Sequence, residues 1–373
     1  MTTFAETFDL SEAGTLLGPS PLARRQYGPQ RKAAIAEAAR IWDRVWNKGD
    51  MRAAVAVKEA LSTSDLFRSA TGDVLDRELL AAYGDIPTQW TEFCRRTTVG
   101  NFKPKTMVDL LGGRSDLALV PELTEYPTAD YRAREFSIRV RKFGRRFAFS
   151  WEASINDDLD ELRQIPGQFA TAARLTEEVQ ALSLLADPTT GAPNTGFFRD
   201  YTGEAIPGPN TTPTTAALTA DNLQAALTAV TTRRDYEGNL VAPGRLLLVV
   251  GVAQEFTARR ILDATEIRVT NGNRQVMEPN YLRGAVDLVV HRRLPGNAWF
   301  LIPAPTEARP ALAIAFLRGF ETPDIRQKAD QGIGAGQDSG SFEIDDVQFR
   351  VRHVVGAASL LPLHTYASTG AGS

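Results

Sequence analysis

A long stretch rich in proline and glycine, residues 101–130, lies in the first half of the chain. Short strand-like pieces, such as residues 117–120, are separated there by Pro104, Gly112, Gly113, Pro121 and Pro127. An irregular segment of this length inside a folded chain is uncommon and is usually functional. Two extended strands with no further partner cannot bury their own apolar side chains. We therefore predict a β-rich excursion that needs a partner surface.

The composition is that of a folded globular protein. The chain has 373 residues, of which 43% are hydrophobic and 23% are charged, and its formal net charge is −3. This length allows two lobes, or one domain that carries large insertions. The small net charge gives no overall indication of a nucleic-acid-binding protein or of a membrane-surface protein.

The single cysteine, Cys94, excludes an internal disulfide framework and a cysteine-rich zinc site. We interpret this cysteine as a small buried apolar residue. Residues 1–14 carry three acidic residues and no basic residue, which is unlike a secretory signal. The longest apolar run, residues 246–250, is far too short to span a membrane. We expect the protein to be made and folded in the cytoplasm.

The region before the excursion contains an amphipathic segment that begins at Pro29. Ile35, Trp42 and Trp46 recur there at helical spacing on one face, and a second helix follows over residues 54–61. Two exposed tryptophans on one helix would be costly, so this face must pack against something. The body of the same subunit and a neighbouring subunit are both possible partners.

A basic strand follows the excursion. Phe136, Ile138 and Val140 alternate with polar residues, which is typical of a half-buried strand. The phase of the alternation changes after Gly144, which predicts a bulge or a sharp bend there. Residues 132–146 carry seven basic residues and one acidic residue. We favour a solvated or subunit-facing strand over a phosphate-binding one, because charged strands also pair with acidic neighbouring surfaces.

The rest of the chain predicts one long helix and a mixed lobe. The helix covers residues 157–186, is capped by Asn156, and either kinks or divides at Pro166 and Gly167. A loop over residues 189–215 comes next. The further elements expected are helices at 223–232 and 254–262, strands at 246–250, 288–290, 299–302 and 311–316, a long strand at 347–355 and an extended segment at 359–367.

No arrangement of residues indicates catalysis or metal binding. The three histidines, His291, His353 and His364, lie far apart, and His353 on an apolar strand face is typical of a core or interface residue. The acidic pair Asp157 and Asp158 has a sufficient structural role at a helix start. The glycines at 332, 334 and 336 do not have the spacing of a nucleotide-binding loop. We expect no enzyme activity, no catalytic residue, no cofactor and no metal.

Several segments resemble a known family of shell proteins. These are residues 142–150 (KFGRRFAFS), 156–159 (NDDL), 317–323 (LRGFETP) and 350–353 (RVRH). From about residue 65 to the end, the order of elements is similar to the HK-ninety-seven-type capsid fold, and locally to Mu-like major head subunits of tailed bacteriophages. The resemblance implies an α+β chain with an N-terminal arm, an extended β loop, a peripheral domain with a long spine helix, and a mixed axial domain.

The resemblance also implies domain boundaries. Residues 1–64 would be the arm and residues 101–135 the extended loop that reaches over a neighbouring subunit. The peripheral domain would combine residues 65–100, 136–187 and 339–356, and the axial domain residues 188–338 and 357–373. In relatives such subunits form hexamers and pentamers of an icosahedral shell that encloses double-stranded DNA. Scaffolding, portal and decoration proteins are the further partners expected, and no membrane.

The residues expected at contacts between subunits are Trp42, Trp46, Lys103, Lys105, Arg114, Asp116, Arg139, Arg141, Arg145 and Arg146. Some relatives join a loop lysine covalently to a neighbour's asparagine. Lys103 and Lys105 lie near the base of the excursion rather than at its tip, so we predict no such crosslink. We expect the arm to be retained, and the shell to assemble in the host cytoplasm and to form part of the virion.

Three other interpretations are alternatives to a phage head protein. An encapsulin-like nanocompartment would share the fold but hold enzyme cargo in place of DNA. A portal or a tail-tube protein would form rings or tubes rather than closed shells. An unrecognised enzyme is the third alternative, and the missing site motifs oppose it.

Overall fold

The computed structural model describes residues 65–111, 119–120, 122, 125–126, 132–150, 159–204, 206–235, 238–271, 274–307, 309–327 and 346–372. The chain divides into two compact units, and each unit draws on three separate segments of the sequence. The first consists of Met1–Pro87, Arg141–Thr176 and Phe316–Val355, and the second of Thr88–Val140, Glu177–Ala315 and Gly356–Ser373. Three of the five boundaries fall inside elements, namely helix α7 (Leu159–Leu185) and strands β10 (Leu312–Leu317) and β12 (Asp346–Ser359).

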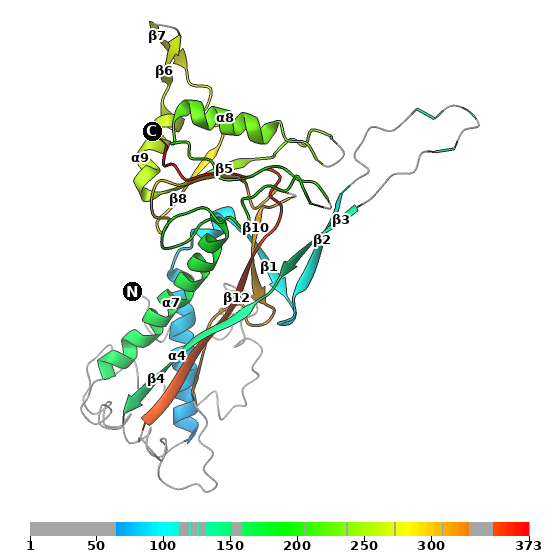
Figure 1. Cartoon of the computed structure of the whole chain (residues 1–373). Helices are drawn as coiled ribbons and strands as arrows, with labels where there is room; N and C mark the ends of the chain where they lie inside the picture. Colours follow the sequence, from blue (N-terminus) through cyan, green and yellow to red (C-terminus); the bar gives the residue numbers. More distant parts are fainter. Residues whose placement is uncertain are drawn as a thin grey trace. The chain divides into compact units, whose positions relative to one another are not determined.

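The first unit is organised around the long strand β12 (Figure 1). This strand pairs antiparallel with β4 (Arg141–Ser150) and with β11 (Asp324–Gln327). Residues 349–352 of β12 pair with both partners, so β4 and β11 flank β12 on opposite sides. Helices α4 (Asp65–Asp85) and α7 supply the remaining apolar side chains of this core.

The second unit contains a four-stranded sheet in the order β13-β9-β5-β8. The strands are β5 (Leu246–Gly251), β8 (Asp287–His291), β9 (Trp299–Pro303) and β13 (Tyr366–Ser368). Strand β5 is buried at every position, as expected of a strand covered on both faces. Helices α8 (Ala220–Thr231) and α9 (Glu255–Asp263) pack with Leu246, Leu248 and Val250 in one apolar cluster, and a 3-10 turn, η2 (Val252–Gln254), precedes α9.

Two narrow ribbons of paired strands also belong to the second unit (Figure 1). One joins β2 (Lys105–Leu111) to β3 (Arg132–Ile138), and the other joins β6 (Glu266–Asn271) to β7 (Arg274–Pro279). A short helix, α5 (Trp90–Phe93), precedes β1 (Arg95–Val99). Strand β1 lies at one end of a sheet in the order β1-β10-β12-β11, in which β4 also pairs with β12.

The expected long helix is observed as α7, and its described bounds lie within the predicted range of 157–186. It continues through Pro166 and Gly167, so the alternative of two separate helices is wrong. A proline inside a helix removes one backbone donor but does not by itself end the helix when both flanks are packed. Here Ala170 and Ala173 are buried immediately after the proline. The predicted cap, Asn156, lies outside the described residues.

The irregularity predicted at Gly144 is wrong. The pairing of β4 with β12 runs without interruption from Ser150 to Arg141, with Gly144 directly opposite Arg352. The change of phase occurs earlier, at Arg139 and Val140, where the chain leaves β3 and enters β4. A side chain at Gly144 would collide with the carbonyl oxygen of Val351, so this glycine permits a close approach of two backbones.

The elements of the expected mixed lobe are confirmed, because α8, α9, β5, β8, β9 and β10 all occur within three residues of their predicted bounds. Strand β12 extends further than predicted, to Ser359, and the last segment contains only the short strand β13. Helix α4 and the β6–β7 ribbon were not predicted. The helices expected before residue 64 lie outside the described part of the chain.

Candidate subunit interface

The β2–β3 ribbon carries apolar side chains that its own unit leaves uncovered. Its register runs from Lys105 opposite Ile138 at the base to Leu111 opposite Arg132. Val108, in the middle of β2, is 55% exposed. The same excursion contains three further exposed large hydrophobic residues: Phe102, Leu119 and Tyr126. Surface hydrophobic residues occur singly in most proteins, but their concentration in one excursion marks a surface for interaction.

The base of the ribbon is anchored in the second unit. Ile138 and Val140 are buried, and the Arg134 guanidinium donates a hydrogen bond to the carbonyl oxygen of Ile206 at 2.6 Å. A cleft of about 240 Å³ lies beside this anchor, and its lining includes Arg134 and Tyr201. Its lining also carries the surface ion pair of Arg199 with Glu204 at 2.5 Å. A cleft of mixed charge with no nucleophile and base in contact contains no recognisable catalytic arrangement.

The structure places six of the ten residues expected at subunit contacts, and all six are exposed: Lys103, Lys105, Arg139, Arg141, Arg145 and Arg146. Lys105 begins the ribbon at its base, which agrees with the position inferred from the sequence. The other four residues, Trp42, Trp46, Arg114 and Asp116, lie outside the described ranges. Exposure is compatible with a contact role, but the role itself stays a prediction.

The register of β4 separates its arginines into two groups. Directly paired residues of an antiparallel sheet point to the same face. Arg141 and Arg145 are opposite Val355 and Val351, so they share the face that bears the apolar core of the first unit. Arg146 is opposite Arg350 and belongs to the other face. The sequence alone does not distinguish these basic residues, whereas the register of the strand assigns them to two faces of the sheet.

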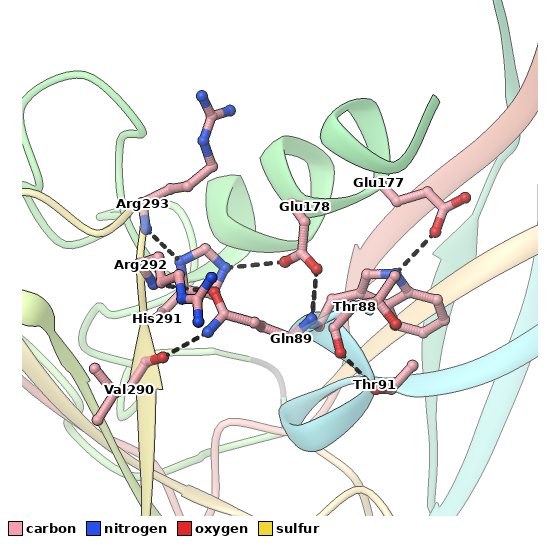
Figure 2. A network of polar contacts seen from close by, with 10 residues as sticks. Thr88, Gln89, Thr91, Glu177, Glu178, Val290, His291, Arg292 and Arg293 are labelled. Carbon is pink, nitrogen blue, oxygen red and sulfur yellow. Dashed lines mark hydrogen bonds and ion pairs between the residues drawn. The ribbon is translucent and has the colours of Figure 1, made fainter. Parts of the chain in front are cut away.

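A network of buried polar groups joins three segments of the second unit (Figure 2). Nε2 of His291, which is fully buried, lies 3.1 Å from a carboxylate oxygen of Glu178. The other oxygen of Glu178 accepts hydrogen bonds from the backbone N–H groups of Gln89 and Trp90 at 2.6 Å and 3.3 Å. Nδ1 of His291 accepts from the backbone N–H of Arg293, so Nε2 carries the proton toward Glu178.

Two neighbouring contacts complete this network. The side-chain amide of Gln89 donates to the carbonyl oxygen of Val290 at 2.9 Å, as Figure 2 shows. The indole N–H of Trp90 donates to Glu177, a fully buried carboxylate, at 2.9 Å. Buried charged groups are tolerated when they are paired and hydrogen-bonded, as here. The arrangement therefore fastens α7 to β8 and α5, and no local sequence pattern indicates it.

The surroundings of Cys94, His353 and His364 indicate structural roles for these residues. Cys94 is buried, as predicted, and burial raises the pKa of its thiol, with the nearby Glu178 charge acting in the same direction. His353 lies among Tyr83 and Phe316 in the first unit, with ring centroids 5.9 Å and 6.0 Å away. Burial lowers the pKa of His364, whose Nε2 lies 2.8 Å from the carbonyl oxygen of Val241. Among the described residues, no group of three or more potential ligands is placed to hold a metal ion.

A half-buried arginine, Arg233, fixes the segment before β13. The Arg233 guanidinium donates to the carbonyl oxygens of Leu363 and Thr365 at 2.8 Å and 2.6 Å, and lies 3.4 Å from that of Pro362. Burial lowers the pKa of Arg233 to about 10, and the hydroxyl of Tyr366 acts in the opposite direction.

The Arg233→Met substitution is expected to lower the free energy of unfolding by about 2–3 kcal/mol, because the carbonyl oxygens it serves lose a charged donor while buried. Urea denaturation followed by tryptophan fluorescence measures this loss. The adjacent Arg234→Met is the matched control, since Arg234 is exposed and its guanidinium donates, among the described residues, to the carbonyl of Gly238. Equal effects of the two substitutions would contradict this role for Arg233.

The helices of the described part of the chain include none that is both long and apolar enough to cross a membrane.

Comparisons with known proteins agree with this architecture. A family model described as phage capsid protein matches residues 134–367, which is more than half of the chain. No curated protein matches the sequence. The chain therefore belongs to the phage capsid protein family, and its place is the capsid of the virion. This confirms the resemblance to tailed-phage major capsid proteins, and with the observed order of elements it confirms the expected α+β fold of the HK-ninety-seven type.

Solved structures with a similar course of the chain are also capsids or shells. The capsid of cyanophage P-SCSP1u is 12% identical, with 76% of this chain and 88% of that chain covered and a TM-score of 0.49. The mature capsid of bacteriophage PhiM1 is 12% identical, with coverages of 76% and 87% and a TM-score of 0.47. An encapsulin complex from Synechococcus elongatus is 13% identical, with coverages of 74% and 84% and a TM-score of 0.38.

Proposed function

We propose that this capsid protein assembles into hexamers and pentamers of an icosahedral shell that encloses a double-stranded DNA genome. The observation that carries the proposal is the β2–β3 ribbon, which exposes Val108 and is paired only within itself among the described strands. Contacts in a closed symmetric shell repeat many times, so a modest contact made by each ribbon suffices for a stable particle.

The domain assignment belongs to the same proposal. Residues 101–135 are the extended loop, and they reach over a neighbouring subunit. Residues 65–100, 136–187 and 339–356 form the peripheral domain, and residues 188–338 and 357–373 form the axial domain around the centres of hexamers and pentamers. The arm, residues 1–64, packs through Trp42 and Trp46. Scaffolding, portal and decoration proteins complete a shell that is assembled in the host cytoplasm.

Electron microscopy of the overexpressed and purified chain tests this proposal. Closed shells of uniform size are expected, and their absorbance spectrum distinguishes DNA contents from the enzyme cargo of an encapsulin-like compartment. Rings or tubes in place of shells would indicate a portal or a tail-tube protein. A stable monomer at all concentrations would overturn the proposal.

We predict that neighbouring subunits are not joined covalently. Lys105 starts the ribbon opposite Ile138, and Lys103 precedes it in the sequence, so both lysines lie at the base of the ribbon, at the opposite end of β2 from Leu111. Shells boiled in detergent and reductant should therefore run as a single band of 40.7 kDa on a denaturing gel. Ladders of higher mass, or material that does not enter the gel, would contradict this prediction.

A further inference from the structure

Three arginines form a row across the sheet of the first unit. Arg146 on β4 is directly opposite Arg350 on β12, and Arg350 is directly opposite Arg326 on β11. Paired residues share a face, so the three side chains leave the sheet on the same side. Adjacent strands lie about 4.8 Å apart, so the row is about 10 Å wide. We call these three residues the arginine row.

The surroundings of the arginine row are also basic. Lys142 and Arg352 occupy alternate positions on the same face, and Asp324 is opposite Arg352. The Asp324 carboxylate accepts from Arg352 at 2.7 Å and 3.0 Å and lies 3.2 Å from Nε of Arg326. One carboxylate is therefore shared by two arginines, and the face keeps an excess of positive charge.

The outer members of this face project into solvent. Lys142, Arg146 and Arg350 are all exposed, and none of them pairs with a carboxylate of the described residues. Gly144 is the β4 residue opposite Arg352, so no side chain from that strand covers the Arg352 guanidinium.

Most of the core lies on the opposite face of the sheet, although Val354, opposite Lys142 on the face of the row, is also buried. Phe147 stacks on Phe349 at 5.1 Å and on Phe169 of α7 at 5.4 Å. Tyr83 of α4 contacts His353, which also belongs to that face. These contacts of α4 and α7 are made on the side away from the arginine row, which accordingly has no part in the core of its unit.

Like charges at directly opposite positions of a sheet destabilise it. Folding of the subunit alone gives no reason to place three arginines in one row, whereas a polyanion bound on this face would offset their repulsion. Arginine is suited to that role, because its planar guanidinium binds phosphate through two parallel hydrogen bonds.

We propose that the arginine row, together with Lys142, binds the phosphate backbone of packaged double-stranded DNA without regard to base sequence. This inference rests on the proposed function and assigns the DNA-facing side of the first unit. It also moves Arg146 from the group expected at subunit contacts to the group that contacts DNA. The remainder of the chain is acidic overall, with a formal net charge of −3, so this face is a local site rather than part of a general basic surface.

Duplex DNA fits this face better than an acidic protein surface does. A duplex presents one negative charge per about 1.7 Å of its axis, so about six phosphates lie along the width of the row. An acidic protein surface would need several mutually repelling carboxylates within the same width. The ring of Phe320 beside the row packs against the Arg352 guanidinium, 5.3 Å from the ring centroid, rather than standing free for bases, so contact with the phosphate backbone is expected.

The test compares the full-length chain with the double variant Arg146→Gln/Arg350→Gln. Fluorescence anisotropy of a short labelled duplex of mixed sequence, titrated with purified chain over a series of salt concentrations, gives the affinity and its salt dependence. The double variant should bind about tenfold more weakly at about 0.1 M salt, and the slope of log K against log salt should be smaller by about 2. The control, Arg283→Gln/Arg292→Gln, removes the same charge from exposed positions of the second unit and should bind like the unmodified chain.

The thermal midpoint of each variant is measured on the same samples. The Gln variant should unfold at the same temperature as the unmodified chain or higher, since it removes repulsion from the row. The variant Arg146→Lys/Arg350→Lys keeps the charge without the paired donors, and it should retain the slope and lose part of the affinity. The Lys variant also keeps the proposal testable if the Gln variant does not fold.

Electron microscopy of the same preparations separates this inference from the proposed function. Normal duplex binding by a Gln variant that no longer forms shells would show that the row contacts another protein surface, and would overturn the inference. Equal weakening in the Gln variant and the control, or no binding by the unmodified chain, would overturn it as well. Row-dependent duplex binding by a chain that never forms shells would instead overturn the proposed function and leave the row as a nucleic-acid site.

Discussion

Val108→Lys is expected to reduce the yield of assembled shells at least about tenfold, because a charge that is removed from water at each ribbon contact, even beside a carboxylate, costs well over the 1.4 kcal/mol that corresponds to a factor of ten. The free subunit should tolerate the change. Val108 is 55% exposed and lies directly opposite Glu135, so the new ammonium group meets a carboxylate on the neighbouring strand. The substitution therefore tests assembly and leaves folding intact.

Size-exclusion chromatography and electron microscopy of the purified subunits measure the yield of shells. Leu240→Lys provides the matched control, since Leu240 is 60% exposed and lies between α8 and β5, outside the ribbon. The control should assemble as the unmodified chain does. Normal shells from Val108→Lys would show that the ribbon is not covered by a neighbour, and the proposed role of residues 101–135 would be withdrawn.

Glu178→Ala is expected to have the largest effect on stability, a loss of about 3–5 kcal/mol in the free energy of unfolding. Removal of this carboxylate leaves the buried Nε2–H of His291 and two backbone N–H groups without their acceptor. Glu178→Gln should lower the free energy of unfolding by less, because its amide oxygen can still accept from the two backbone N–H groups. Some loss remains, because the amide NH2 group then faces the Nε2–H donor of His291.

Urea denaturation of the unmodified chain and of the two Glu178 variants measures these losses in the free energy of unfolding. Glu255→Ala is a suitable control. Glu255 forms an ion pair with Arg259, which lies one turn further along α9. The cost of this substitution should stay near 0.3–0.5 kcal/mol, about the value of such helix pairs. A loss below about 1 kcal/mol for Glu178→Ala would mean that water replaces the carboxylate, and that the network of Figure 2 is not a stabilising element.

The parts of the fold that could be predicted from the sequence are those whose residues lie close together in it. Strand β5 is an uninterrupted apolar run, and β12 alternates from Val347 to His353, so local periodicity predicts both. Helix α4 was overlooked although its buried residues Leu75, Leu79 and Tyr83 recur at intervals of four. The β6–β7 ribbon carried a signal too, since Gly272 and Asn273, the two residues between Asn271 and Arg274 in the sequence, are a dipeptide typical of a hairpin turn.

The site is different because its partners are distant in the sequence. Glu178 lies 113 residues from His291 and 89 from Gln89, and no local pattern brings these three together. The arginine row needs the register of three strands, and a shift of one residue would place Arg146 on the other face. The exposure of the β2–β3 ribbon could be anticipated, because a pair of strands has too few neighbours to cover both of its sides.

The interleaving of the two units has a consequence for biosynthesis. The first unit lacks β11 and most of β12 until residues 316–355 have been translated, and the second lacks β13 until residues 366–368 have been translated. The core of the first unit therefore cannot close until these late residues are made, whereas in the second unit the exposed edge of β9 waits for β13. Apolar side chains of the first unit thus stay uncovered through much of translation, and high expression should increase the demand for chaperones.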